Sequence, residues 1–300
     1  MPSYRNTYRA AAPLEVKEWH AQTPAEEYDL NFVYEVPEKA FETPGGMRVE
    51  PLIPSLHAPR LFHLFDKFSD GYRFLPYGPF PTYASFLTWL ESVRRTEQTL
   101  LFVVYDIALD LDNNDEDLQP GQPLREERIA GLVGVLNSRA HDRMTELGHL
   151  HIPPPFQRTH VLTHSMALLL HWVLDPPSSS PSSSSPVPHP LGLRRVQWFA
   201  NKHNLPSITA AKRLAFEQEA YHMTWDRFLP PSKTEGAVEL PAFLYGERRE
   251  VEAARGKGRH SALLGTGWDA WENGGREKVD ALVAREVKRR KAKDVPGLLD

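Results

Sequence analysis

A carboxylate and two imidazoles stand close together in a short apolar segment, ELGHLHI, which runs from Glu146 to Ile152. The segment has the pattern of a β-strand, and alternation along a strand places His149 and His151 on one face. Glutamate and histidine are residue types that often move protons in catalysis, histidine because its ordinary pKa lies near neutrality. For each residue taken alone, the competing interpretation is a surface glutamate or a structural histidine with no catalytic role.

The same segment leads into a turn and a helix whose start is suited to binding an anion. The triple proline at 153–155 ends the strand, because proline cannot continue a β ladder. A polar turn follows, and an apolar helix begins at about Val161. The first backbone N–H groups of a helix have no intrahelical acceptor and can point at a phosphate. Arg158 and Thr163 add a positive charge and a hydroxyl to this turn.

A second strand–bend–helix unit follows downstream. Residues 195–199 form an apolar strand, and residues 206–214 a short helix. Asn204 and Ser207 stand at the start of this helix, and helix capping by itself explains both residue types.

At these residues the chain resembles the GNAT acyltransferase superfamily, in the branch of the ribosomal-protein-alanine acetyltransferases and their small-amine relatives. That branch has a pyrophosphate turn of the form Q/R-x-x-G-x-G/A followed by Thr-Glu-Ala, and later N-x-x-S ahead of a helix that ends in R-L-G-F. The corresponding residues are Gln157, Arg158, Thr159, His160, Val161 and Leu162, then Thr163, His164 and Ser165, then Asn204 and Ser207, and finally Arg213, Leu214, Ala215 and Phe216. The order and spacing of these motifs carry the resemblance, which covers about residues 46–275.

The resemblance implies an α+β fold with a mixed, mostly antiparallel sheet of about seven strands and helices on both faces. The strand at 146–152 is expected to splay from a parallel neighbour at 195–199. It also implies acyl transfer from acetyl-CoA, as co-substrate and without a metal, to a primary amine of a peptide N-terminus or small molecule. The alternative is a weakened or inactive relative that binds a partner.

The resemblance also assigns roles to residues. Glu146 is the expected general base, acting through water, with His149 or His151 as a replacement. Ser207 is expected to protonate the leaving thiolate. The expected cofactor-binding residues are Gln157, Arg158, Thr159, His160, Val161, Leu162, Thr163 and Asn204. Tyr72, Tyr77 and Phe80, in the aromatic connection YRFLPYGPF, are expected to contact the acceptor, although they equally suit the anchoring of a long loop.

Three positions depart from the family pattern. His160 and Leu162 replace the two small residues of the pyrophosphate turn, and Ala215 replaces the glycine of R-L-G-F. Glycine normally serves where backbone approaches a ligand closely, so bulkier residues there are expected to weaken binding of CoA unless their side chains point away from it.

Composition limits the remaining function classes. The chain has 300 residues, 41% of them hydrophobic, which is enough for one large domain. Its 35 basic and 39 acidic residues give a net charge of −4, which provides no general attraction to nucleic acid or anionic membranes. The absence of cysteine excludes disulfides, thiolate metal sites and a cysteine nucleophile. No segment is apolar for long enough to span a bilayer, and we expect a cytoplasmic protein, with the nucleus as the alternative. We expect the protein to be a monomer or a homodimer.

We expect three parts: an N-terminal arm at 1–45, the acyltransferase-like domain at 46–275, and a basic C-terminal helix at 276–300. Insertions are expected at about 110–126, 175–190 and 228–258, the second because its serine and proline residues cannot form a packed core. The basic run at 288–293 suits the end of a helix. A nuclear-import signal or an RNA contact is the alternative there.

Overall fold

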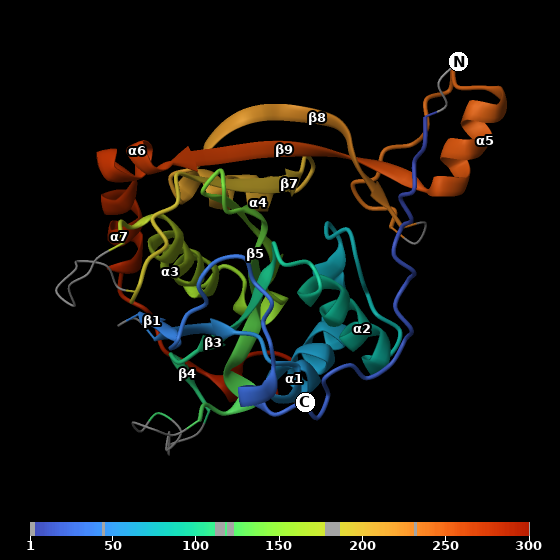
Figure 1. Cartoon of the computed structure of the whole chain (residues 1–300). Coiled ribbons are helices and arrows are strands. Elements are labelled where there is room, and N and C mark those ends of the chain that lie inside the picture. The colour runs from blue at the N-terminus through green and yellow to red at the C-terminus, as the bar shows by residue number, and fades with distance from the viewer. Residues whose placement is uncertain are drawn as a thin grey trace.

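The computed structural model describes residues 4–43, 46–111, 118, 123–177, 187–230 and 233–299. The insertions expected at 110–126 and 175–190 lie partly outside these residues. The described chain forms one large twisted sheet of eight strands in the order β1-β2-β3-β5-β6-β7-β9-β8, with helices on both faces (Figure 1). The α+β fold class predicted from the sequence is therefore confirmed.

Seven of the eight strands lie where apolar or alternating segments occur in the sequence. They are β2 (Met47–Pro51), β3 (Leu100–Asp106), β5 (Ile129–Arg139), β6 (Met144–His151), β7 (Arg195–Asn201), β8 (Glu217–Leu229) and β9 (Lys257–Gly267). The eighth, β1 (Phe41–Thr43), comes from the N-terminal arm and pairs with β2 as an edge strand.

One pair of neighbouring strands in this sheet is parallel. Residues 144–146 of β6 pair with residues 195–197 of β7, and all other neighbours are antiparallel. Both strands continue for several residues after this short ladder, but no further pairs join them in the described part of the chain. The two strands therefore splay beyond Glu146, as predicted, and leave the edge of β6 unpaired.

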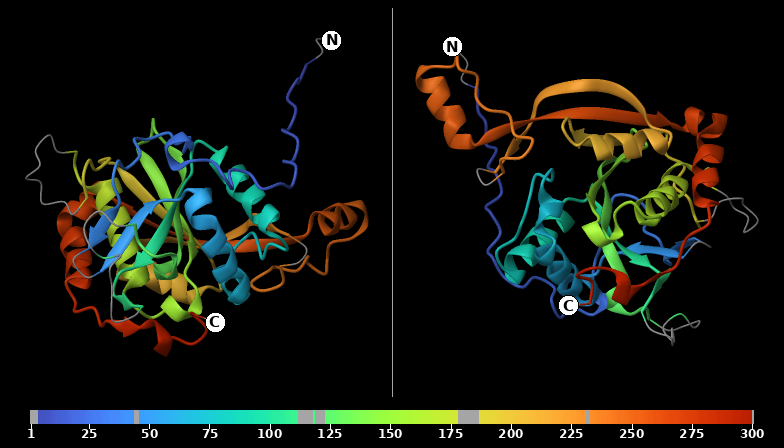
Figure 2. Two further views of the ribbon diagram at one scale, coloured as in Figure 1. Left: turned by 90° about the horizontal axis from the view of Figure 1, so that it is seen from below. Right: turned by 180° about the vertical axis from the view of Figure 1, so that it is seen from behind.

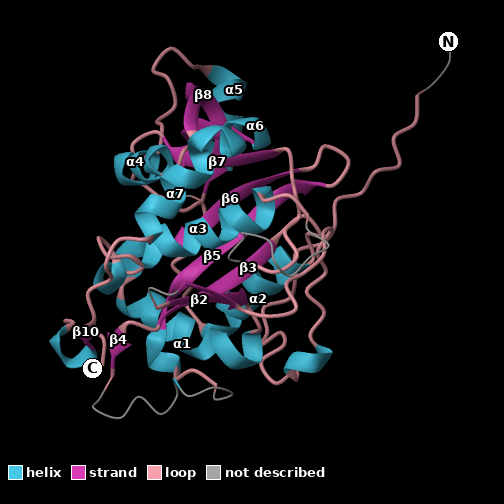
Figure 3. Cartoon of the chain, turned by 90° about the vertical axis from the view of Figure 1, so that its left-hand side faces the viewer, coloured by secondary structure: helices cyan, strands magenta, loops and turns pink. Residues whose placement is uncertain are grey.

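Two layers of helices cover the sheet (Figure 3). Helices α1 (Pro54–Lys67) and α2 (Tyr83–Arg94) pack with one set of side chains from β3 and β5 into one core. Helix α3 (Val161–Leu174) packs into a larger core on the opposite face. Nearly every residue of α3 is buried, because its sequence is apolar on all sides. Helix α4 (Leu205–Arg213) packs near β7, β8 and β9.

The predicted insertion at 228–258 forms an arm at the far end of β8 and β9. Its helix α5 (Gly246–Arg255) buries no residue and stands away from the body of the protein (Figures 1 and 2). By contrast, the base of the arm, from Lys233 to Val238, contacts both the α1–α2 connection and the end of β7.

The predicted C-terminal helix is shorter than expected. A short helix α6 (Trp268–Ala270) and a π-helical turn at Trp271–Gly275 lead into α7 (Arg276–Val283), which ends well before the basic run. Arg290 instead lies in a two-residue strand, β10 (Arg290–Lys291), that pairs with β4 (Leu109–Asp110). Its guanidinium donates to Asp106 Oδ2 at 3.0 Å and to the Pro155 carbonyl at 2.7 Å. These tertiary bonds favour extended chain over the helix predicted to continue to Lys293.

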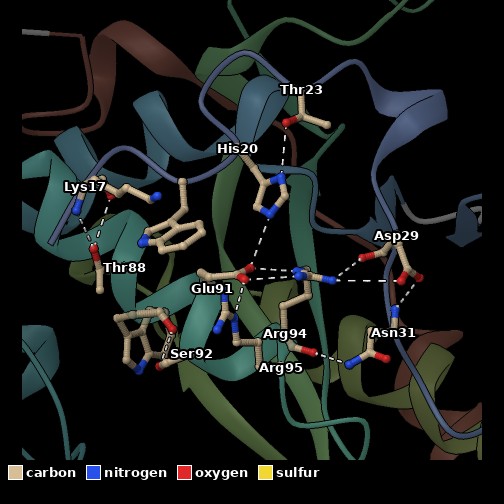
Figure 4. A network of polar contacts seen from close by, with 12 residues as sticks. Lys17, His20, Thr23, Asp29, Asn31, Thr88, Glu91, Ser92, Arg94 and Arg95 are labelled. Atoms are coloured by element: carbon tan, nitrogen blue, oxygen red, sulfur yellow. Dashed lines mark hydrogen bonds and ion pairs between the residues drawn. The ribbon is translucent and has the colours of Figure 1, made fainter. Parts of the chain in front are cut away.

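The N-terminal arm packs on the domain from about Lys17 onward. Glu91, buried on α2, accepts hydrogen bonds from Arg94 and Arg95 and lies 3.3 Å from His20 of the arm (Figure 4). Asn31 donates to the carbonyl of Arg94 at 2.9 Å.

Among the described residues, no helix is long and apolar enough to cross a membrane.

Candidate functional site

A β-bulge in β6 places the candidate bases together. Gly134 pairs with Gly148 and Leu132 with His151, so β6 has one extra residue here, and His149 adopts a left-handed φ of +51°. Glycine has no Cβ, but the position that a Cβ would take shows which side chains lie on the same face. On Gly134 this position lies 3.6 Å from the Cβ of His149, and on Gly148 it lies 3.5 Å from Glu146 Oε1. Paired residues share a face, so the bulge brings His149 to the face of Glu146. Simple alternation would have separated them.

Glu146 is buried at the last parallel pair before the strands splay. Its Oε2 accepts a hydrogen bond of 2.6 Å from the Asn137 amide on β5. Its Oε1 lies 4.0 Å from Arg227 Nη2 on β8. Burial raises the pKa of this carboxyl above its ordinary value, against the lowering effect of Arg227, the Asn137 hydrogen bond and Arg259. The raised pKa brings the group closer to the range useful for a general base.

His149 faces an aromatic wall. Its Nδ1 lies 3.1 Å from the Tyr77 hydroxyl, and the Tyr77 ring stacks on Trp89 with 4.4 Å between centroids. Burial, and then the charge of Arg227, lower the pKa of His149 to about 4. The imidazole is therefore neutral at pH 7 but a weak base, less well suited to the role than Glu146.

The remaining predicted acceptor residues extend the same wall. Tyr72 is buried, and its ring meets Tyr77 at 6.3 Å and Phe80 at 5.8 Å. His151 stacks on Phe65 at 3.8 Å, and burial followed by the charge of Lys233 lowers its pKa to about 3. The structure thus brings the three predicted aromatic residues together beside the candidate bases, whereas His151 is packed as a neutral core residue.

The predicted anion-binding turn lies between β6 and α3. Gln157 and Arg158 are exposed, and Arg158 has a left-handed φ of +59°. The Thr159 hydroxyl accepts from the amide of Val161 at 3.3 Å. On the first turn of α3, Thr163 accepts a hydrogen bond of 3.1 Å from Arg213 of α4. The turn therefore presents helix N–H groups flanked by two guanidinium groups.

The two bulky residues in this turn direct their side chains inward. His160 Nε2 lies 3.2 Å from Asp106 Oδ1, and the side chain of Leu162 packs against the larger core. Both side chains are thus held against the body of the protein, which fits the condition for binding a pyrophosphate there. The third departure, Ala215, has a φ of +67°, a conformation that favours glycine.

Helix α4 presents Asn204 and Ser207 on the far side of the splay. Asn204 Oδ1 accepts from the Ser207 amide at 3.2 Å, so Asn204 is an N-cap. The Ser207 hydroxyl accepts from the Trp198 indole at 3.0 Å, which leaves its own proton available for another acceptor.

Sequence reasoning missed several residues of this site. Asn137 could have been predicted from the β5–β6 hairpin, because the two strands are close in sequence and their register places Asn137 near Glu146. Arg227, Arg259 and Lys233 lie in the region around the long insertion, and no motif indicated them. Their positions depend on irregular β8–β9 pairing, with register shifts before Arg227.

Within the described part of the chain, no cluster of three or more histidine, cysteine, aspartate or glutamate side chains is arranged to hold a metal ion.

Comparisons with known proteins support the fold. No family model matches the chain, and no curated protein matches it. A GCN5-related N-acetyltransferase from Brucella melitensis has a TM-score of 0.59 and 21% identity, over 84% of this chain and 89% of that one. A probable acetyltransferase of the GNAT family from Chromobacterium violaceum has a TM-score of 0.56 and 20% identity, over 91% of this chain and 100% of that one. At these identities the likeness defines a class of fold: the chain has the GNAT acetyltransferase fold.

Proposed function

We propose that the protein is an acyl-CoA-dependent N-acyltransferase that transfers an acetyl group to a primary amine. The observation that carries this proposal is the splay of β6 and β7 beyond Glu146, with a β-bulge at His149 and an anion-binding helix start at the end of the same strand. An unpaired strand edge can bind an extended amide-containing chain as an added strand. The helix start next to it can bind phosphates.

The residues of the turn fit a pyrophosphate. Arg158 supplies an exposed charge, the start of α3 supplies N–H groups, and the side chains of His160 and Leu162 point elsewhere. Acetyl-CoA would supply a thioester, a reactive acyl donor. Asn204, at the start of α4, is placed on the opposite side of the splay and would help to hold the pantetheine.

The general base and the general acid of the proposed reaction would lie on β6 and α4, respectively. Glu146 would take the proton from the acceptor ammonium, directly or through water, because burial raises its pKa toward neutrality. Ser207 would give a proton to the leaving thiolate, since its hydroxyl already accepts from Trp198 and is oriented to donate elsewhere. Tyr72, Tyr77 and Phe80 would form the wall against which the acceptor lies.

Titration with acetyl-CoA by calorimetry tests the first half of the proposal. Micromolar binding is expected, about −8 kcal/mol. Arg158→Ala should weaken it by roughly 1.5–3 kcal/mol, the usual contribution of a hydrogen bond to a charged group, while Arg158→Lys should retain part of it. A screen of amines with detection of released thiol tests the second half. Absence of binding at millimolar acetyl-CoA would instead indicate a non-catalytic binding protein.

A further inference from the structure

The base of the 228–258 arm brings a buried cation to the acceptor wall. Lys233 has a residue exposure of 6%, and its Nζ donates to the Tyr72 carbonyl at 2.8 Å. The same Nζ lies 5.5 Å from the centroid of the Tyr72 ring. An ammonium has three N–H donors, so this contact uses one of them.

Lys233 has no acidic partner at ion-pair distance among the described residues. Burial lowers its pKa to about 8, so the group still carries most of its charge at pH 7. Buried charges are costly unless an opposite charge or several hydrogen bonds offset the loss of water. The charge of Lys233 is therefore suited to an anionic partner from outside the described residues.

A second polar group, beside Lys233, lacks hydrogen-bond partners. Both ring nitrogens of His151 are buried without a hydrogen bond, and the imidazole lies against Tyr72 with 4.4 Å between centroids. Arg227 and Arg259 are directly opposed on β8 and β9, and both lower the pKa of Glu146. Lys233 and these two arginines thus supply three cations around the site, against the carboxyl groups of Glu146 and Asp226, an arrangement that disfavours polycationic amines.

The base of the arm also bridges two neighbouring parts of the protein. Glu235 forms an ion pair with Arg73 in the α1–α2 connection, and the Gly236 carbonyl accepts from Asn201 at the end of β7. These two contacts tie the base of the arm to elements from both sides of the splay. A small acceptor suits a site that is bridged in this way better than a long peptide does.

We propose that Lys233 binds the carboxylate of the acceptor, which is a small amine with an acidic group and an apolar or aromatic body, such as an aromatic amino acid. That the bound molecule is an acceptor rests on the proposed function. The carboxylate-binding site itself depends only on residues of the arm and of the aromatic wall. The body of such a molecule would extend from Lys233 along the aromatic wall, and its amine would lie toward His149 and Glu146.

Binding of two matched probes separates this inference from catalysis. The probes are 3-phenylpropanoate and 3-phenylpropanamide, which share the aromatic body, lack an amine and differ in charge. By calorimetry on the full chain at pH 7, the carboxylate should bind roughly ten- to hundredfold more tightly than the amide. Lys233→Met should abolish that preference, and Lys233→Arg should retain part of it.

Glu235→Gln is the matched control, because it weakens the anchoring of the same arm without removing the cation. It should keep the carboxylate preference of the natural chain. Equal affinities for the two probes, no binding of either up to about 10 mM, or a preference that survives Lys233→Met would each overturn the inference. A failure to bind acetyl-CoA would count against the proposed function alone, since neither probe depends on it.

Discussion

Arg227 Nη2 lies 4.0 Å from Glu146 Oε1, although β8 and β6 are separated in the sheet by β7 and β9. The long β8–β9 pair arches over the body of the protein (Figure 1), and its pairing shifts register before Arg227. One end of the sheet thus sets the electrostatic environment of a carboxylate near its middle.

The first prediction follows from this contact and concerns pH. As a general base Glu146 acts when deprotonated, so activity should fall as the pH falls through its raised pKa. Burial raises that pKa, whereas Arg227, the Asn137 hydrogen bond and Arg259 lower it, and Asp226 adds to the rise. Removing the Arg227 charge by Arg227→Gln should therefore raise the pKa of Glu146 further and move the acid limb of the kcat/KM profile to higher pH.

The control for this prediction is Lys257→Gln, which removes a cation of the arm that pairs with Glu239. It should leave the profile in place. An acid limb that stays unchanged in Arg227→Gln would remove Glu146 from the role of base, and His149 would be the next residue to replace.

A second prediction separates catalysis by Ser207 from helix capping. Ser207→Ala should lower turnover while leaving binding of acetyl-CoA nearly intact, because protonation of a leaving thiolate matters only as the C–S bond breaks. The variant also leaves the buried Trp198 N–H without its acceptor, which should cost about 1–3 kcal/mol of stability. Turnover must therefore be expressed per folded molecule, and an unchanged value would reduce Ser207 to a structural residue.

The third prediction uses the strained position of Ala215. A residue with a Cβ loses roughly 1–2 kcal/mol in the left-handed region, while glycine adds about 0.4–1 kcal/mol of unfolded-chain entropy. Ala215→Gly should therefore raise the free energy of unfolding by about 0.5–1 kcal/mol. Ala210→Gly, within helix α4, should instead lower it by about 1 kcal/mol or more. Urea unfolding of both variants is the measurement, and destabilisation by both would show that Ala215 is not strained.

The fold was predictable because local pattern and tertiary structure agree along most of the chain. The apolar strands β3 and β5 and the helix α3 bury what their sequences make apolar. The basic tail was predicted wrongly because helical spacing cannot show that Arg290 will bond to Asp106, 184 residues earlier in the chain. For the same reason Lys233 escaped notice, since its contact with Tyr72 joins residues 161 positions apart. The bulge at His149 also leaves no clear mark in a segment that alternates regularly.

The last prediction concerns how the N-terminal arm is held on the domain. Burial alone would raise the pKa of Glu91, but hydrogen bonds from Arg94 and Arg95 outweigh it and lower the pKa, aided by His20 (Figure 4). A carboxyl with a lowered pKa stabilises the fold above its unfolded pKa, and this contribution is lost as the pH falls through the folded value. Glu91→Gln should reduce the free energy of unfolding at pH 7 by roughly 1.5–3 kcal/mol. The difference from the natural chain should begin to shrink below about pH 4.3, the ordinary pKa of glutamate. It should disappear only below the lowered pKa of folded Glu91, where the carboxyl is neutral in the folded and unfolded states alike. Chemical unfolding at pH 7 and pH 3.5 measures the free energy of unfolding of the variant and of the natural chain. Asp29→Asn is the control. The exposed Asp29 lies 3.9 Å from Arg94 and should contribute less than about 1 kcal/mol. A difference between Glu91→Gln and the natural chain that stays constant with pH would show that the charge of Glu91 does not anchor the arm.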